Sequence, residues 1–151
     1  MKLQAEQMRL YAVTDRAWAA DEEAFWDQVR AAIAGGATMV QLREKHLAED
    51  AFLAEAECFV ALCREAGVIS IINDNVDIAV KTGADGVHVG QEDLAAGRAR
   101  QLLGPDKIIG VSAHNAEEAR AAQAAGADYL GVGAAFVTGT KTDAKPISRD
   151  T

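Results

Sequence analysis

Cysteine, proline and aromatic residues are scarce in this sequence of 151 residues, and long apolar runs are absent. Two residues are cysteine, two are proline and 5% are aromatic. No stretch approaches the roughly 18 apolar residues that a membrane span needs. The opening residues, MKLQAEQMRLYAV, contain no apolar segment typical of a signal peptide. We therefore expect no membrane partner and no cleaved leader.

The two cysteines, Cys58 and Cys63, fall within one predicted helix. At about 100° per residue, a spacing of five places their side chains roughly 140° apart on that helix. They cannot share a metal ion or a disulfide there, so we expect both to be thiols in the core. Two buried free thiols favour a reducing compartment, and we predict a cytoplasmic protein.

Basic residues are outnumbered, with 15 Lys and Arg against 23 Asp and Glu, for a net charge of -8. A nucleic-acid-binding protein is usually basic or carries a basic stripe, so nucleic acid is excluded as a partner. The overall charge also repels phosphorylated small molecules. A substrate of that kind would need local cations or a metal ion.

One pattern recurs along the chain. An alanine-rich helix stops at glycine, a short apolar run follows, and a polar or glycine-rich loop comes after it. Continuous apolar runs rich in Val and Ile are typical of strands buried on both faces. The pattern predicts strands at 8–13, 38–42, 68–72, 85–89, 108–112 and 128–132, and helices at 21–34, 49–66, 75–82, 94–103 and 115–125.

Alternating strands and helices predict an α/β fold with a parallel sheet in a single domain over residues 1–151. A doubly wound dinucleotide fold would have a G-x-G-x-x-G turn after the first strand, and VTDRAWAADEE (13–23) has no glycine. Polar residues gather after every strand instead, as in a (β/α)8 TIM barrel. A barrel needs at least about 200 residues, so we expect six strands and five helices, without the last two βα units.

This expectation has a consequence for the edges of the sheet. Strands one and six would each leave backbone donors and acceptors unpaired. A chain that truly ends at Thr151 would therefore form dimers through these edges or aggregate, and a homo-oligomer is possible.

The residues after the strands predict the chemistry of the site. In a barrel they converge on one mouth. They include cations, carboxylates, amides and hydroxyls, an inventory that suits a phosphate or diphosphate ester with a hard divalent metal. The set comprises Gln41, Arg43, Glu44 and Lys45; Asn73, Asp74 and Asn75; His88, Gln91, Glu92 and Asp93; Ser112 and His114; and Thr138, Thr140, Lys141 and Thr142.

Each of these residues also has a purely structural interpretation. Residues 73–75, Asp93 and Ser112 could cap helices, although Asn115 competes with Ser112 for that role. Residues 43–45 could form a solvated turn, and 138–141 an ordinary loop. His88 lies within a predicted strand, where a hydrogen-bonded core imidazole is the simpler interpretation. Caps explain one residue in each loop, but not the alternation of cation-rich and carboxylate-rich loops around one rim.

Six segments together resemble the thiamine-phosphate synthase family. The similarity runs from about Tyr11 to the C-terminus, and the order of the segments makes it specific. The segments are QLREK (41–45), IINDNVDIA (71–79), ADGVHVGQEDL (84–94), IIGVSAHN (108–115), GADYLGVGAAF (126–136) and TGTKTDA (138–144).

The resemblance implies a (β/α)8 barrel that joins a hydroxymethylpyrimidine diphosphate to a thiazole ethyl phosphate, giving thiamine phosphate and pyrophosphate. It also implies Mg²⁺ as cofactor and ionisation of the diphosphate before the thiazole nitrogen attacks. The implied roles are Asp74 and Asp93 as metal ligands; Arg43, Lys45, Asn73, Ser112 and Lys141 at the diphosphate; Gln41 near the pyrimidine; and Thr138 and Thr140 at the thiazole phosphate.

The sequence departs from the family pattern in two places. Asn75 stands where the family often has a second aspartate, and residues 134–140 lack the usual prolines. Two alternatives stay open. One is the related thiazole tautomerase, which the set of Asp74, Asp93 and Lys141 disfavours. The other is an inactive, truncated barrel that only binds phosphate ligands or a partner chain.

Overall fold

The computed structural model describes residues 3–91, 96–136, 138–139, 146–148 and 150. Its six strands form one parallel sheet in which every strand pairs with its neighbours in sequence, from β1 to β6. The strands are β1 (Tyr11–Val13), β2 (Met39–Leu42), β3 (Ile69–Asn73), β4 (Gly86–Val89), β5 (Ile108–Ala113) and β6 (Tyr129–Val132).

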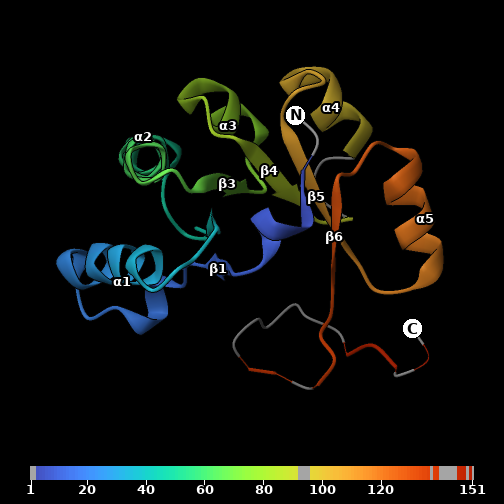
Figure 1. Cartoon of the computed structure of the whole chain (residues 1–151), viewed down its shortest axis with the longest axis horizontal. Helices are drawn as coiled ribbons and strands as arrows, with labels where there is room; N and C mark the ends of the chain where they lie inside the picture. Colours follow the sequence, from blue (N-terminus) through green and yellow to red (C-terminus); the bar gives the residue numbers. More distant parts are fainter. Residues whose placement is uncertain (1–2, 92–95, 137, 140–145, 149, 151) are drawn as a thin grey trace.

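Helices connect successive strands and cover one face of the curved sheet, following one another around its outside (Figure 1). This arrangement confirms the six-stranded, five-helix part of a (β/α)8 barrel. The helices are α1 (Glu22–Ala34), α2 (Glu49–Ala66), α3 (Val76–Thr82), α4 (Ala96–Leu103) and α5 (Ala116–Ala124); two short 3-10 helices are η1 (Ala5–Met8) and η2 (Arg16–Trp18).

The ends of the helices follow from local sequence. Asp21, Asn75 and Asn115 each precede a helix, and each side chain accepts a hydrogen bond from a backbone N–H of the first turn. Gly67 and Gly83 end α2 and α3 with φ of 69° and 68°, the left-handed conformation that glycine adopts without steric cost. The predicted stop signals are confirmed at these helices.

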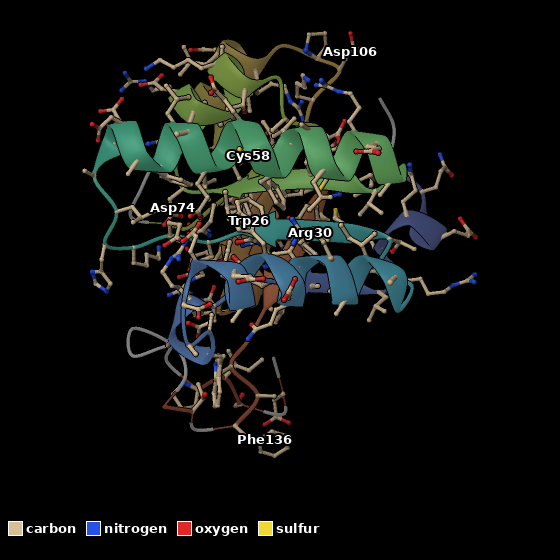
Figure 2. All side chains as sticks on the ribbon, turned by 90° about the vertical axis from the view of Figure 1, so that its left-hand side faces the viewer. Trp26, Arg30, Cys58, Asp74, Asp106 and Phe136 are labelled. Atoms are coloured by element: carbon tan, nitrogen blue, oxygen red, sulfur yellow. The ribbon has the colours of Figure 1, made fainter. Side chains whose placement is uncertain are left out.

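The sheet has two different faces. On the outer face, strand side chains pack against the helices in a large apolar core that includes Phe25, Phe59 and Ile72. In Figure 2, α1 and α2 run side by side over this face. The inner face has a smaller apolar cluster built from strand residues and closed by Leu3 and Met8 of the N-terminal segment. The polar side chains described below lie on the same inner side.

Two predictions about the first half of the chain were wrong in detail. Residues 8–13 were expected to form a strand, but the chain enters through η1 and β1 begins only at Tyr11. Cys58 was expected in the core, but it is exposed on the outward side of α2 (Figure 2). Cys63 is buried, as expected. The same spacing of about 140° that separates the two thiols puts Cys58 outside the apolar stripe.

The two edges of the sheet are β1 and β6, as expected. Large apolar side chains near them are exposed, including Val13, Leu130 and Val132. Within the described residues, no helix is both long enough and apolar enough to cross a membrane.

Candidate functional site

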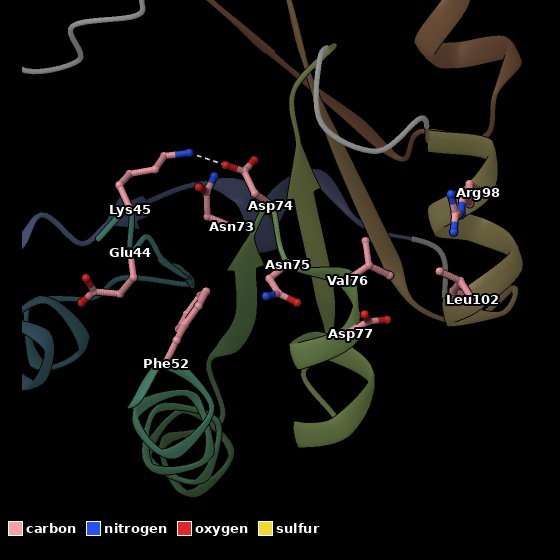
Figure 3. A pocket seen from close by; sticks show the side chains of 10 residues that line it. All are labelled: Glu44, Lys45, Phe52, Asn73, Asp74, Asn75, Val76, Asp77, Arg98 and Leu102. Carbon is pink, nitrogen blue, oxygen red and sulfur yellow. Dashed lines mark hydrogen bonds and ion pairs between the residues drawn. The ribbon is translucent and has the colours of Figure 1, made fainter. Parts of the chain in front are cut away.

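The carboxyl ends of β2 and β3 bring a cation and a carboxylate together. Lys45 Nζ contacts Asp74 Oδ2 in an ion pair between side chains that are 33% and 26% exposed (Figure 3). Asp74 has φ of 63°, and it is the one residue other than glycine with positive φ in the described part of the chain. A residue other than glycine in this conformation indicates a local backbone constraint, which sets the direction in which the carboxylate points.

Arg43 follows β2, two residues before Lys45. Its backbone N–H donates to Thr14 Oγ1 at 3.0 Å, which ties the loop after β2 to the loop after β1. Its guanidinium has no ion-pair partner among the described residues, and the side chain is partly exposed. A partly exposed arginine with no carboxylate partner in the described part of the chain is suited to binding an anion.

Asn73 and Gln41 are buried on the inner side of the sheet and bond to each other. Asn73 Nδ2 donates to Gln41 Oε1 at 2.8 Å, and Gln41 Nε2 donates to the Tyr11 hydroxyl at 2.7 Å. Asn73 Oδ1 is buried, and it finds no hydrogen-bond donor within the part of the chain that the structure describes. A buried, unpaired amide oxygen is costly, so this atom is suited to receive a ligand.

Ser112 belongs to the same inner face. Its hydroxyl is 2.9 Å from His88 Nε2, and the other ring nitrogen of His88 is 3.0 Å from the Tyr129 hydroxyl. Tyr129 Oη in turn lies 2.6 Å from Tyr11 Oη. The expectation that His88 is a hydrogen-bonded core imidazole is confirmed. Gln91, which follows β4, lies nearby, because its Nε2 donates to the Ser112 carbonyl at 2.9 Å.

The alternative capping roles divide among these residues. Asn75 caps α3, since its side chain accepts from Ile78 N at 2.9 Å. Asn115 rather than Ser112 caps α5. Asn73 bonds to Gln41 and not to a helix terminus. Capping therefore explains Asn75, but it does not explain Asn73 or Ser112.

Arg16 and three carboxylates form a group of charges that the sequence did not predict, and one of them, Glu44, lies between Arg43 and Lys45 in the loop after β2. Arg16 Nε donates to Glu44 Oε1 at 3.0 Å and Nη1 donates to Glu22 Oε2 at 2.7 Å, while Nη2 contacts Glu55. The Glu44 side chain is only 5% exposed, so the predicted solvated turn at residues 43–45 is wrong for its middle residue. Arg16 also lies over the Phe25 ring, 4.3 Å from its centroid.

Burial changes the protonation of Glu55 in this group. Desolvation, and then the neighbouring Glu44 carboxyl, raise its pKa to about 8 despite the opposing effect of Arg16. One guanidinium cannot fully compensate three carboxylates that approach it. The signal that could have identified the group is the acidic residue at 44 inside an otherwise basic loop.

The mouth of the site opens into a hollow of about 580 Å³. Figure 3 shows its lining, with Lys45 and Asp74 pointing toward one another and Asn75 and Asp77 at the start of α3. Arg98 of α4 lines the same hollow from the far side and is exposed. Sequence reasoning did not select Arg98, because it lies within a helix rather than after a strand.

The described oxygen ligands fit a hard divalent cation. Asp74 supplies a carboxylate at the mouth, and the adjacent Asn73 supplies the unpaired buried amide oxygen. Mg²⁺ commonly takes one or two carboxylates and completes its octahedron with water and phosphate oxygens. Among the described residues, no group of three or more Asp, Glu, His or Cys side chains is arranged to hold a metal ion.

Several predicted site residues lie outside the described part of the chain. These are Asp93, Thr140 and Lys141. Thr138 is described and is exposed, in the segment that follows β6. The residues that the structure does bring together are therefore Gln41, Arg43, Lys45, Asn73 and Asp74 around β2 and β3, with Ser112 joined to them through the inner face.

Residues 10–151 match the family model described as thiamine monophosphate synthase. The chain belongs to this family. The resemblance carried by the six sequence segments is confirmed.

Individual relatives agree with the family assignment. A thiamine-phosphate synthase from Moorella thermoacetica is 55% identical over 116 residues, which are 77% of this chain and 55% of that protein. A thiamine biosynthetic bifunctional enzyme from Arabidopsis thaliana is 47% identical over 149 residues, which are 96% of this chain and 28% of that protein. The chain thus spans about half or less of these two relatives.

A solved structure shows the same fold. The thiamine phosphate pyrophosphorylase from Pyrococcus furiosus superposes with a TM-score of 0.78 at 37% sequence identity. The match covers 87% of this chain and 62% of that one. The six strands and five helices therefore correspond to most, but not all, of the related barrel.

Proposed function

We propose that this chain carries the pyrimidine-diphosphate half of a thiamine-phosphate synthase site. The proposed transferase reaction joins 4-amino-2-methyl-5-hydroxymethylpyrimidine diphosphate to 4-methyl-5-hydroxyethylthiazole phosphate, and it yields thiamine phosphate and pyrophosphate. The observation that carries the proposal is the pairing of Lys45 with Asp74, next in sequence to the buried Asn73, together with Arg43, which has no ion-pair partner among the described residues. Family membership supplies the chemistry that this arrangement would serve.

The proposed reaction breaks the bond between the pyrimidine methylene carbon and a diphosphate oxygen. The electron pair leaves with pyrophosphate, and the aminopyrimidine ring stabilises the resulting cation. The thiazole nitrogen then donates its lone pair to that carbon. No covalent intermediate with the protein is needed, so the side chains act by positioning and by charge.

Charge on the leaving group is the main barrier that the protein can lower. Arg43 and Lys45, in the loop after β2, would bind diphosphate oxygens, and Lys141 would add a third cation. Ser112 would donate a hydrogen bond to the same group, and Asn73 would bind beside it. Mg²⁺, held by Asp74 and Asp93, would supply further positive charge to the diphosphate.

The remaining assignments concern the second substrate and the setting. Gln41 would face the pyrimidine, and Thr138 and Thr140 would bind the thiazole phosphate. We propose phosphorylated small molecules as the ligands, with a homo-oligomer as a possible assembly and a cytoplasmic location. This chain spans only part of the length of its relatives. The proposed roles therefore apply to a complete barrel that contains these residues.

The decisive experiment follows pyrophosphate release from both substrates with Mg²⁺, on protein whose mass has been verified. Release that needs both substrates and Mg²⁺ is the expected result. Asp77→Asn is the matched control for Asp74→Asn, because Asp77 lines the same hollow from the first turn of α3. Isomerisation of a thiazole phosphate without pyrophosphate release would contradict the synthase and favour the tautomerase.

A further inference from the structure

One side chain from each of the six strands joins a continuous hydrogen-bonded chain on the inner face. It links the two ends of the proposed diphosphate site, Asn73 and Ser112, through Gln41 and three residues that have no role in the proposed reaction. In order, the members are Asn73 (β3), Gln41 (β2), Tyr11 (β1), Tyr129 (β6), His88 (β4) and Ser112 (β5).

The first half of this chain fixes the direction of its protons. Gln41 accepts from Asn73 through Oε1, so its Nε2 is the atom that donates to Tyr11. Tyr11 already accepts this proton, and its own proton needs another acceptor. Across the described residues the structure offers one, the Tyr129 hydroxyl at 2.6 Å. Each hydroxyl has a single proton, so Tyr129 must pass its own proton onward.

The second half then follows. Tyr129 donates to His88 Nδ1, which must be the unprotonated nitrogen of a neutral imidazole. His88 Nε2 therefore carries the proton and donates it to Ser112 Oγ at 2.9 Å. Ser112 accepts within the chain, and its own hydroxyl proton remains available for a ligand.

The opposite direction of the chain has the opposite consequence. Turning both amides would make Ser112 the donor to His88, with only lone pairs facing a ligand. A diphosphate oxygen accepts hydrogen bonds and cannot donate them. Ser112 can therefore bind such a group when His88 donates to it, and not when Ser112 donates to His88.

The fold makes space for this chain at two glycines. A Cβ at Gly110 would lie 2.1 Å from Tyr129 Cζ, and one at Gly131 would lie 3.0 Å from His88 Cε1. Burial raises the pKa of Tyr11 to about 12 and raises the pKa of Tyr129 as well, so both hydroxyls keep their protons at neutral pH. Chains of buried hydrogen bonds also reinforce one another.

We propose that Tyr11, Tyr129 and His88 are positioning residues that hold His88 as the Nε2–H tautomer and thereby present Ser112 as a hydrogen-bond donor to a diphosphate. The choice of diphosphate rests on the proposed function. The direction of the chain rests on the orientation of the Gln41 and Asn73 amides in the structure. An effect of the distant Tyr11 on anion binding at Ser112 follows from the same chain.

The first test measures the tautomer without any substrate. Nitrogen-15 NMR of the imidazole rings, with His88→Gln to assign the signal, is expected to show an Nε2–H tautomer at neutral pH. Tyr129→Phe removes the donor to Nδ1, so both tautomers should become populated. Ser70→Ala is the control, because it deletes another buried hydroxyl. That hydroxyl donates to Asp85, and neither residue belongs to the hydrogen-bonded chain on the inner face.

Three results would overturn the proposal at this stage. They are an Nδ1–H tautomer in the unmodified chain, a doubly protonated ring, or a tautomer that Tyr129→Phe leaves unchanged. None of these readings depends on the identity of the substrate.

The second test uses pyrophosphate with Mg²⁺ as the probe and measures binding by calorimetry. Tyr129→Phe should weaken binding by about tenfold, the size expected for one misdirected hydrogen bond. In a Ser112→Ala background the same change should have no further effect, because the donor is already gone. Equal weakening in both backgrounds would contradict the proposal. If the unmodified protein shows the expected tautomer but does not bind pyrophosphate, the proposed function is rejected, and so is a diphosphate as the ligand of Ser112.

Discussion

The two faces of the sheet are built from the same strands, yet they differ in chemistry. On the outer face, Phe59, Cys63 and Ile72 are fully buried between strands and helices. On the inner face, apolar residues fill only one end, and hydrogen-bonded polar side chains occupy the rest. The comparison separates two kinds of residue: those that hold the half-barrel together and those that prepare it for a ligand.

The same difference divides what each face can tolerate. An apolar core loses stability when volume is removed, whatever the direction of its bonds. A polar chain loses its function when a single proton is redirected, with little change in volume. Substitutions on the two faces should therefore affect different measurements.

Removing volume from the outer face should have the largest effect on stability. Phe59 is fully buried where α2 packs on the sheet, so Phe59→Ala should lower the free energy of unfolding by about 3–5 kcal/mol. Phe59→Leu, which keeps most of the volume, should cost far less. Denaturant unfolding followed by circular dichroism measures both. Equal costs for the two variants would mean that packing at this position does not limit stability.

Adding volume to the inner face should have the next largest effect. Gly110→Ala places a methyl group 2.1 Å from the Tyr129 ring and should cost about 1–3 kcal/mol, with loss of the Tyr129 to His88 bond. Gly97→Ala in α4 is the matched control, because nothing lies within 4 Å of its new methyl group. That variant should be neutral or more stable by up to about 1 kcal/mol, since alanine favours helix. A stable Gly110→Ala chain with an unchanged His88 signal would contradict the described packing.

Changing charge at the mouth should affect activity and leave stability nearly unchanged. Asp74→Asn keeps the size of the side chain but removes the partner of Lys45 and a proposed metal ligand. Turnover in the pyrophosphate assay should fall by at least about 10–100-fold, with a higher requirement for Mg²⁺. Asp77→Asn should keep normal Mg²⁺ dependence. The metal assignment fails if Asp74→Asn keeps it too.

The two faces also differ in how much the sequence could predict. Strand and helix positions were predicted nearly throughout, because continuous Val and Ile runs alternate with helices that stop at Gly67 and Gly83. The first strand was misplaced, since residues 8–10 carry the same apolar content as a strand but join a 3-10 turn. Propensity does not distinguish a short strand from the turn that leads into it.

The sequence predicted which residues gather at the candidate site, but not the hydrogen bonds that connect them. Placement after parallel strands brought Gln41, Lys45, Asn73 and Asp74 together, because such ends meet at one edge of a barrel. The link through Tyr11 and Tyr129 joins residues 118 apart in sequence, and spacing along the chain does not predict it. The Arg16 group was missed for a similar reason, since its carboxylates come from three separate elements.

The Arg16 group, with Glu22, Glu44 and Glu55, gives the smallest expected effect on stability and the sharpest dependence of stability on pH. Burial raises the pKa of Glu55 to about 8 in the folded chain, against an ordinary value of 4.5 in the unfolded chain. Between these values the folded state holds a proton that the unfolded state has released. The contribution of Glu55 to stability is therefore complete below about pH 4.5 and declines as the pH rises toward 8.

Glu55→Gln mimics the protonated carboxyl at every pH, so it separates this effect from other titrations. The variant and the unmodified chain should melt at similar temperatures near pH 5. Near pH 8.5 the variant should melt about 2–4 °C higher, because Arg16 then faces two carboxylates instead of three. Glu57→Gln, an exposed position on the same helix, is the control and should show no such difference. If Glu55→Gln instead melts lower at alkaline pH, the Glu55 carboxylate is ionised and stabilises Arg16, and the group acts as an ion pair rather than as a proton-holding site.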